Sequence, residues 1–138
     1  MKQIYQVTPF VHVPDMAQAL DFLTRVLRFE LKYREANYAY LEWGDAALRL
    51  LEERGRPRAV PGDSARVTIY IDVRDVDALH VELRSELATL PAGDVVPPED
   101  QPWSQRELLV RLPDGHWLAF GQAISAERAA AARARHHE

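Results

Sequence analysis

The sequence has no cysteine among its 138 residues. This absence excludes disulfide bonds, thiolate nucleophiles and zinc sites built on cysteine ligands. No apolar run approaches the roughly 18 residues that a membrane-spanning helix needs. The opening residues, MKQIYQVTPFVHVPD, also lack the basic start and unbroken apolar stretch of a signal peptide. We therefore expect a cytoplasmic protein without a membrane partner.

Positively charged residues are the minority, since 17 Lys and Arg residues stand against 21 Asp and Glu residues, for a formal net charge of −4. No overall positive field would draw the protein onto nucleic acid, so we expect no nucleic-acid partner. Hydrophobic residues make up 47% of the chain and charged residues 28%, which is the balance of a globular domain with a packed core. The length suits one compact domain, or two small modules that share one core.

An internal repeat organises the chain. VTPFVHVPDM at 7–16 aligns without a gap on VTIYIDVRDV at 67–76. Further on, YLEWGDAALRL at 40–50 matches LVRLPDGHWLAF at 109–120 if one residue is inserted at the turn. Each half should therefore contain the same succession of a strand, a helix and a set of hairpin-linked strands.

Apolar periodicity predicts these elements directly. Strands are expected at 5–13, 29–35, 37–43, 46–52, 66–73, 106–112 and 116–122, with a short further strand near 94–96. Asp15 and Asp75 each precede leucines at helical spacing and are placed to cap a helix. The predicted organisation is a first module at 1–53, a linker at 54–64, a second module at 65–123, and a C-terminal helix and tail at 124–138.

The segment HVPDMAQALDFLTRVLRFELKYRE resembles the opening of the vicinal-oxygen-chelate superfamily, which includes glyoxalase I, extradiol dioxygenases and bleomycin resistance proteins. In the second half, PWSQRELLVRLPDGHWLAFGQ is similar to the end of bleomycin resistance proteins. The resemblance covers roughly residues 5–122. It implies an α+β fold of two paired βαβββ modules whose curved mixed sheets enclose a cavity. A second chain commonly completes that cavity, so we expect a homodimer.

The metal positions of this superfamily are occupied by other residue types. Metal-dependent members place one ligand on each of four strands, and alignment puts those positions at Thr8, Arg49, Thr68 and Ala119. None is a usual ligand, and the guanidinium of Arg49 would repel a cation. No HExxH motif offers a replacement. We therefore expect no metal, no cofactor and no catalytic residue, although an enzyme remains an open alternative.

Strand alternation indicates which side chains face the cavity. Flat aromatic rings there can stack on planar heterocycles, and carboxylates can complement a cationic ligand, although rings on strands also serve as core or dimer interface. Trp103 is included because bleomycin resistance proteins carry a Trp within a similar PWxxRE sequence. On these grounds we predict ten ligand-binding residues: Phe10, His12, Tyr38, Tyr40, Arg49, Tyr70, Asp72, Trp103, Glu107 and Trp117.

Two of these residues have alternative interpretations. Arg49 is expected to pair with a carboxylate such as Asp72, Glu42 or Glu107, or else to meet an anionic group of the ligand. His12 and Asp72 can form either an acid/base pair or a structural hydrogen bond, and we favour the second.

The function that we expect is binding of a planar, aromatic small molecule of the antibiotic type, with sequestration in a metal-free cavity. The alternative is a glyoxalase- or dioxygenase-like enzyme (lyase, isomerase or dioxygenase) that uses displaced metal ligands or metal-free acid/base chemistry. A third possibility is a scaffold whose own aromatic side chains fill the cavity.

Overall fold

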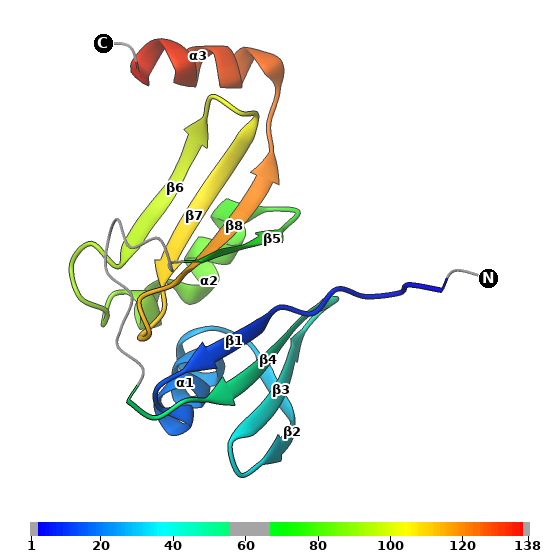
Figure 1. Ribbon diagram of the computed structural model, residues 1–138. Coiled ribbons are helices and arrows are strands. Elements are labelled where there is room, and N and C mark those ends of the chain that lie inside the picture. The colour runs from blue at the N-terminus through cyan, green and yellow to red at the C-terminus, as the bar shows by residue number, and fades with distance from the viewer. Residues whose placement is uncertain (1–2, 56–66, 137–138) are drawn as a thin grey trace.

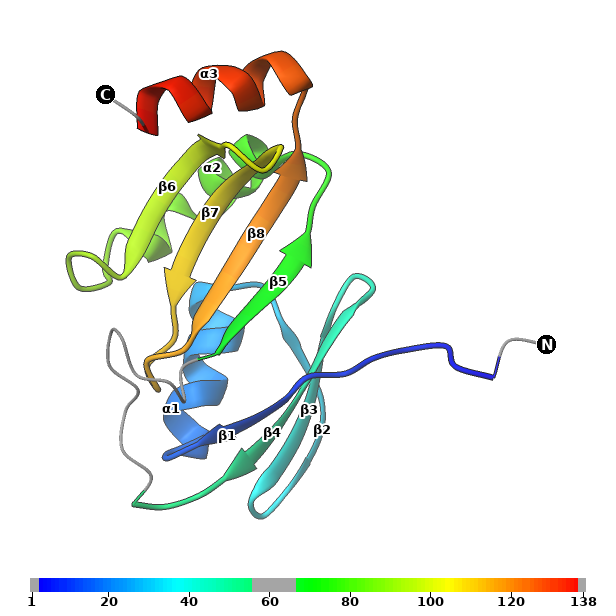
Figure 2. The same ribbon diagram turned by 45° about the horizontal axis from the view of Figure 1, so that its top comes forward.

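The computed structural model describes residues 3–55 and 67–136, which form two separate four-stranded sheets with helices. Figures 1 and 2 show two modules, one above the other, each with its own sheet. This arrangement confirms the predicted α+β fold and the C-terminal helix. The predicted linker at 54–64 lies almost entirely outside the described residues, so the domain boundaries stay predictions. Within the described ranges, no helix is long and apolar enough to cross a membrane.

The first module forms a mixed sheet in the order β1-β4-β3-β2. Strand β1 runs parallel to β4, and the other neighbours are antiparallel. The helix between β1 and β2 begins as an α-helix and ends in a π-helical turn. In chain order the elements are β1 (Phe10–Val13), α1 (Met16–Asp21), the π-helical turn (Phe22–Val26), β2 (Glu30–Glu35), β3 (Tyr38–Trp43) and β4 (Ala46–Glu52).

The second module repeats this topology, as the internal sequence repeat predicts. Its sheet has the order β5-β8-β7-β6, with β5 parallel to β8. A further helix, α3, follows the last strand. The elements are β5 (Thr68–Asp72), α2 (Val76–Leu87), β6 (Val95–Gln101), β7 (Gln105–Arg111), β8 (Trp117–Ala123) and α3 (Ala126–His136).

The helix N-termini are capped in the same way in both modules. Asp15 and Asp75 are the predicted caps, and each accepts a hydrogen bond of 3.0 Å from the backbone N–H three residues later. The last strand of each module adds a second acceptor: Glu52 for α1 and Gln122 for α2, at 2.8 and 2.9 Å from the first helical nitrogen. Two orphan N–H groups per helix are thus satisfied, and each helix is fixed to its own sheet.

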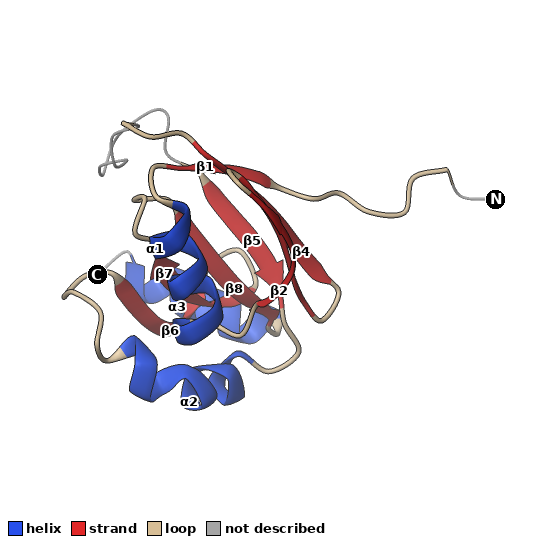
Figure 3. Ribbon diagram, turned by 90° about the horizontal axis from the view of Figure 1, so that it is seen from below, coloured by secondary structure: helices blue, strands red, loops and turns tan. Residues whose placement is uncertain are grey.

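The predicted strand at 5–13 is correct only in its second half. Before Phe10 the chain is extended but pairs with no strand among the described residues, and it projects away from both sheets (Figure 3). Ile4, Tyr5 and Val7 in this segment are 78%, 94% and 87% exposed. An apolar alternation is therefore present, but no strand of the described ranges lies beside it to pair with it.

The short strand predicted near 94–96 is longer in the structure. The proline-containing segment before Trp103 forms β6, a full strand at the edge of the second sheet. Its register with β7 shifts between Val96 and Glu99, around Pro97 and Pro98. Proline cannot donate to a ladder and is tolerated at an edge strand or an irregularity, which explains why the strand persists.

One hydrophobic core joins the helix-facing sides of both sheets. Trp43 lies between the modules, with its ring centroid 5.3 Å from that of Phe29 and 5.8 Å from that of Phe120. Edge-to-face contacts of this kind favour a fixed arrangement of the rings. The largest fully buried side chains come from both modules: Met16, Val26, Leu27, Leu41, Leu48, Leu50, Val76, Leu83, Leu108, Val110, Leu118 and Phe120.

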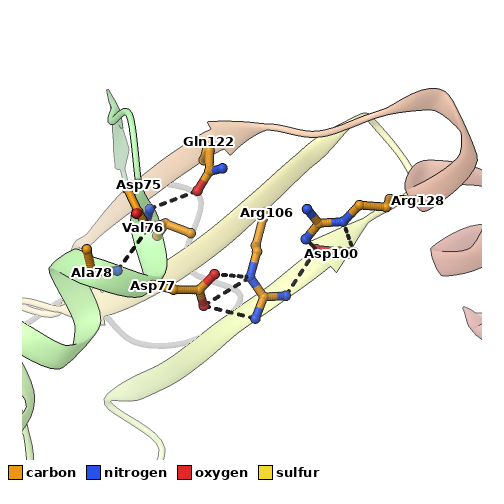
Figure 4. Close-up of polar contacts among 8 residues, drawn as sticks. All are labelled: Asp75, Val76, Asp77, Ala78, Asp100, Arg106, Gln122 and Arg128. Atoms are coloured by element: carbon orange, nitrogen blue, oxygen red, sulfur yellow. Dashed lines mark hydrogen bonds and ion pairs between the residues drawn. The ribbon is translucent and has the colours of Figure 1, made fainter.

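Ionic contacts attach α2 and α3 to the second sheet (Figure 4). Arg106 on β7 donates to both carboxylate oxygens of Asp77 on α2 and, at 3.0 Å, to Asp100 on β6. Arg128 on α3 donates to Asp100 at 2.7 and 2.9 Å. Hydrogen bonds from Arg128, and then from Arg106, lower the pKa of the Asp100 carboxyl from its usual value. The Arg of the PWSQRE segment is therefore a structural residue.

We predict that acid weakens the wild-type protein more than an Asp100→Asn variant. A carboxyl whose pKa is lowered by folding contributes stability at neutral pH, and this contribution is lost as the pH falls through the pKa of the folded state. Between about pH 5 and pH 2 the wild type should lose on the order of 1 kcal/mol more than the variant. Thermal unfolding across this range measures the difference. The exposed Asp45→Asn variant should keep the wild-type profile, and identical profiles for Asp100→Asn and wild type would contradict the prediction.

Candidate functional site

The first sheet carries five of the predicted site residues on one face. Strand pairing places Phe10 and Tyr40 on either side of Arg49, and His12 and Tyr38 on either side of Leu51. Paired residues share a face, and this face is opposite the one that packs on the core. We call Phe10, His12, Tyr38, Tyr40 and Arg49 the arginine face.

The second sheet carries the others. Tyr70 pairs with Ala119, while Asp72 and Glu107 pair with Gly121 from opposite sides, and Trp117 pairs with Arg111. Trp103 joins them from the turn between β6 and β7 through a hydrogen bond to Glu107. We call Tyr70, Asp72, Trp103, Glu107 and Trp117 the glutamate face. The structure thus gathers the ten predicted residues into two groups, one on each sheet.

Arg49 has aromatic partners in place of the carboxylate that we expected. Its guanidinium donates a hydrogen bond to the Tyr38 hydroxyl and lies 4.8 Å from the centroid of the Tyr40 ring. None of the described carboxylates forms an ion pair with it, so the expected pairing with Asp72, Glu42 or Glu107 is wrong within one chain. Aromatic rings and a hydroxyl group carry no negative charge, so these partners do not neutralise the guanidinium.

His12 and Asp72 do not form the pair that we considered. The Nδ1 atom of His12 instead makes a short contact with the Glu53 carboxylate, just after β4. Asp72 is exposed at the end of β5. The sequence offered no sign of the Glu53 contact, because Glu53 follows the last residue of a strand and its direction depends on the chain beyond it.

Glu107 is the most enclosed charged group of the glutamate face, at 8% exposed. Its Oε2 atom accepts two hydrogen bonds, from the Tyr70 hydroxyl at 2.9 Å and from the Trp103 indole N–H at 2.8 Å. Burial, and then the hydrogen bond to Glu107, raise the pKa of the Tyr70 phenol above its usual value, so Tyr70 stays a donor. The second oxygen, Oε1, receives no hydrogen bond from any described residue and is available to a ligand.

Gly121 makes the contact between Tyr70 and Glu107 possible. A Cβ atom built at position 121 would overlap the ring and the hydroxyl oxygen of Tyr70. The Tyr70 side chain therefore crosses β8 over this glycine to reach β7. The ten residues predicted from the sequence do not include Gly121. The available signal was a glycine inside a strand, which often marks a close approach.

The loop that carries Trp103 is held in place although its ring is 61% exposed. Arg133 of α3 donates to the Pro102 carbonyl at 3.1 Å, and the backbone N–H of Ile124 donates to the Ser104 carbonyl, also at 3.1 Å. Ser104 itself has a φ of 67°, which is unusual for a residue with a side chain. The ring is thus a fixed, accessible aromatic surface.

Trp117 is less accessible than Trp103. It is partly buried, and the guanidinium of Arg111 lies 5.9 Å from its ring centroid. Its indole nitrogen is buried without a hydrogen-bond partner in the described part of the chain. Of the two tryptophans on the glutamate face, Trp103 offers far more ring surface to a ligand.

Three of the four family metal positions lie on the same two faces as the site, and Thr8 precedes β1. Thr68 and Ala119 belong to the second sheet, paired with Trp117 and Tyr70, and Arg49 belongs to the first. In the ranges that the structure describes, no group of three or more His, Asp or Glu side chains could hold a metal ion. The side chains at these positions, two threonines, an arginine and an alanine, do not fit a metal.

We predict that the pKa of Tyr70 falls in two variants. Glu107→Gln removes the charge that the phenolate would face, and Gly121→Ala displaces the ring from Glu107, so each makes ionisation of Tyr70 easier. Alkaline titration followed by tyrosinate absorbance should show one tyrosine ionising at lower pH than in the wild type. Adding Tyr70→Phe to either variant should remove that early transition. A titration unchanged in both variants would contradict the arrangement.

The sequence and the fold are similar to those of known proteins. The model of the glyoxalase/bleomycin resistance protein/dioxygenase superfamily matches residues 4–120. A search of curated proteins gave no significant match. A solved bleomycin-binding protein in complex with bleomycin has a TM-score of 0.70 and 21% identity, and the alignment covers 86% of this chain and 98% of that chain.

Two other solved structures agree. A bleomycin resistance determinant encoded on the transposon Tn5 has a TM-score of 0.71 at 20% identity, covering 87% of this chain and 98% of that one. The bleomycin-binding protein of bleomycin-producing Streptomyces verticillus, complexed with copper(II)-bleomycin, has a TM-score of 0.70 at 24% identity, covering 91% and 99%. Identities at this level show the fold alone. Because the family model spans most of the sequence, this chain belongs to the glyoxalase/bleomycin resistance protein/dioxygenase superfamily.

Proposed function

We propose that this protein binds a planar, aromatic small molecule of the antibiotic type and acts by sequestering it in a metal-free cavity. The observation that carries the proposal is the Glu107 cluster, in which a nearly buried carboxylate is held by Tyr70 and by the exposed Trp103. A flat ring beside a fixed negative charge suits a planar ligand with a cationic or hydrogen-donating group. The similar structures that contain bleomycin support a ligand of this class.

Exposed aromatic area on both faces supports binding. Phe10 and Tyr33 on the first sheet are 48% and 50% exposed, and Tyr70 and Trp103 on the second are 40% and 61% exposed. Tyr33 belongs with the arginine face because it pairs with Tyr40. Large exposed apolar groups gathered in this way mark an interaction surface. The third possibility, a cavity filled by the protein's own rings, finds no support in these exposures.

We further propose that the protein is a homodimer in which β1 of one protomer lies along β5 of its partner. Both are edge strands, each paired with only one neighbour in the described chain. A cleft of about 1000 Å³ runs beside β5 and is lined by Ile69, Ile71 and Val73, together with Trp43 and Val7. A strand of a second chain would cover this edge and bring an arginine face opposite a glutamate face.

The enzyme alternative stays a prediction that no specific observation favours. His12 contacts Glu53 in place of Asp72, so the acid/base pair that we considered is not assembled in this chain. Sequestration needs only affinity, which the exposed rings and the two charged groups can supply.

The dimer proposal predicts a solution mass of two chains at micromolar concentration. A Tyr5→Asp/Val7→Asp variant should be monomeric, because it places charge on an apolar segment that is 94% and 87% exposed in the single chain. Light scattering coupled to gel filtration measures both masses. Val81→Asp, at an exposed position of α2, is the control and should stay dimeric. A monomeric wild type would contradict the proposal.

The binding proposal predicts that Trp103→Ala weakens the affinity for bleomycin about fivefold, because a stacked ring contributes on the order of 1 kcal/mol. Isothermal titration calorimetry measures the effect. Val81→Ala serves as the matched control and should bind like the wild type. Absence of bleomycin binding by the wild type at high micromolar concentration, or an unchanged affinity in Trp103→Ala, would count against the proposal.

A further inference from the structure

We infer that Arg49 is an anion-recognition point, so that the ligand of this protein is a planar aromatic compound carrying a carboxylate or another oxyanion. This inference rests on the proposed binding function and deepens it, because it names the chemical class of the ligand. The site then has a positive group, Arg49 at the centre of the arginine face, as well as the negative Glu107.

The charge of Arg49 is not neutralised by its neighbours. The carboxylates near it have other partners: Glu42 accepts from the Tyr40 hydroxyl at 3.2 Å, Glu35 from the Tyr33 hydroxyl, and Glu53 contacts His12. No described carboxylate lies within ion-pair distance of the guanidinium. An arginine stays protonated at every working pH, so this face carries a permanent positive charge.

The guanidinium is also held in position. It lies 4.8 Å from the Tyr40 ring centroid, and one of its N–H groups donates to the Tyr38 hydroxyl. Arg49 stands on β4, an inner strand, and pairs with Phe10 on one side and with Tyr40 on the other. The remaining N–H groups form a planar fork, which matches the two oxygens of a carboxylate better than a single ammonium does.

A ligand that covers the arginine face must compensate the charge of Arg49. A planar ligand that stacks on the exposed Phe10 ring, beside Arg49 in the sheet, excludes water from the guanidinium, which is costly unless the ligand supplies the compensating charge. A ligand that covers this face without an anionic group leaves that charge buried and unpaired, whereas a cationic antibiotic that binds through the glutamate face alone does not. An oxyanion set into the plane of an aromatic ring satisfies stacking and charge together.

Glu107 determines which end of the ligand lies at Arg49. Its carboxylate lies on the glutamate face, where it repels an anion and favours a cationic or hydrogen-donating group. In a cavity walled by one face from each sheet, the two fixed charges of opposite sign select a ligand with unlike ends. The anionic end belongs at Arg49.

Two probes of the same shape test the inference. Quinoline-2-carboxylate and quinoline-2-carboxamide share one planar ring system and differ in charge. By calorimetry, the wild-type protein should bind the acid at least about tenfold more tightly than the amide. Arg49→Gln should bind both alike, with its affinity for the amide near that of the wild type. Arg49→Lys should retain part of the preference, because it keeps the charge without the fork.

The controls separate this inference from the proposed function. Arg34→Gln removes an exposed arginine from the opposite face of the same sheet, where it pairs with the buried Ala39, and should keep the full preference. Wild-type protein that binds neither probe, or binds both equally, overturns the inference, whereas the proposed function falls only if bleomycin binding also fails. A preference that survives in Arg49→Gln overturns it as well, as does dissociation of the dimer in that variant, which would make Arg49 an intersubunit contact.

Discussion

Among the described residues, helices cover each sheet on one face only, and the candidate site depends on that constraint. Side chains alternate along a strand, so every residue that packs on α1 or α2 has neighbours that must face the other way. The helices are fixed to the covered faces by Glu52 and Gln122, which accept hydrogen bonds from the first helical N–H groups. What remains on the uncovered faces is rich in exposed aromatic rings, and this is the physical basis of the binding function that we propose.

The repeat and the alternation predicted the faces correctly because both depend only on periodicity. All ten predicted site residues lie on the two faces or, for Trp103, in the turn that joins one of them. Contacts between strands were less predictable. Tyr70 reaches Glu107 only because Gly121 leaves room for its ring. Arg49 contacts both Tyr38 and Tyr40 because the register of β3 and β4 places Tyr40 opposite Arg49 and Tyr38 two residues further along the same face. The register between neighbouring strands and the side-chain rotamers depend on the folded structure, and the spacing of residues in the sequence does not predict them.

The two errors in strand length have a common cause. Periodicity reports the preference of a segment, whereas a strand also requires a neighbour. Residues before Phe10 have the preference without a neighbour in the chain, and so they extend unpaired. Val95–Gln101 has prolines that weaken the preference, yet β7 offers a neighbour on one side and the strand forms at the sheet edge. In the homodimer that we propose, this unpaired N-terminal segment would have an edge strand of the second chain beside it.

The same PWSQRE segment serves structure and site through alternation. Arg106 faces α2 and α3, where it bridges Asp77 and Asp100, while the next residue, Glu107, faces the uncovered side and meets Trp103. The ionic contacts that hold α3 also bring Arg133 to the Pro102 carbonyl and so steady the Trp103 loop. A ring that is fixed before a ligand arrives loses little entropy on binding. In the function that we propose, affinity would therefore depend on α3, because this helix steadies the loop of the Trp103 ring on which the ligand would stack.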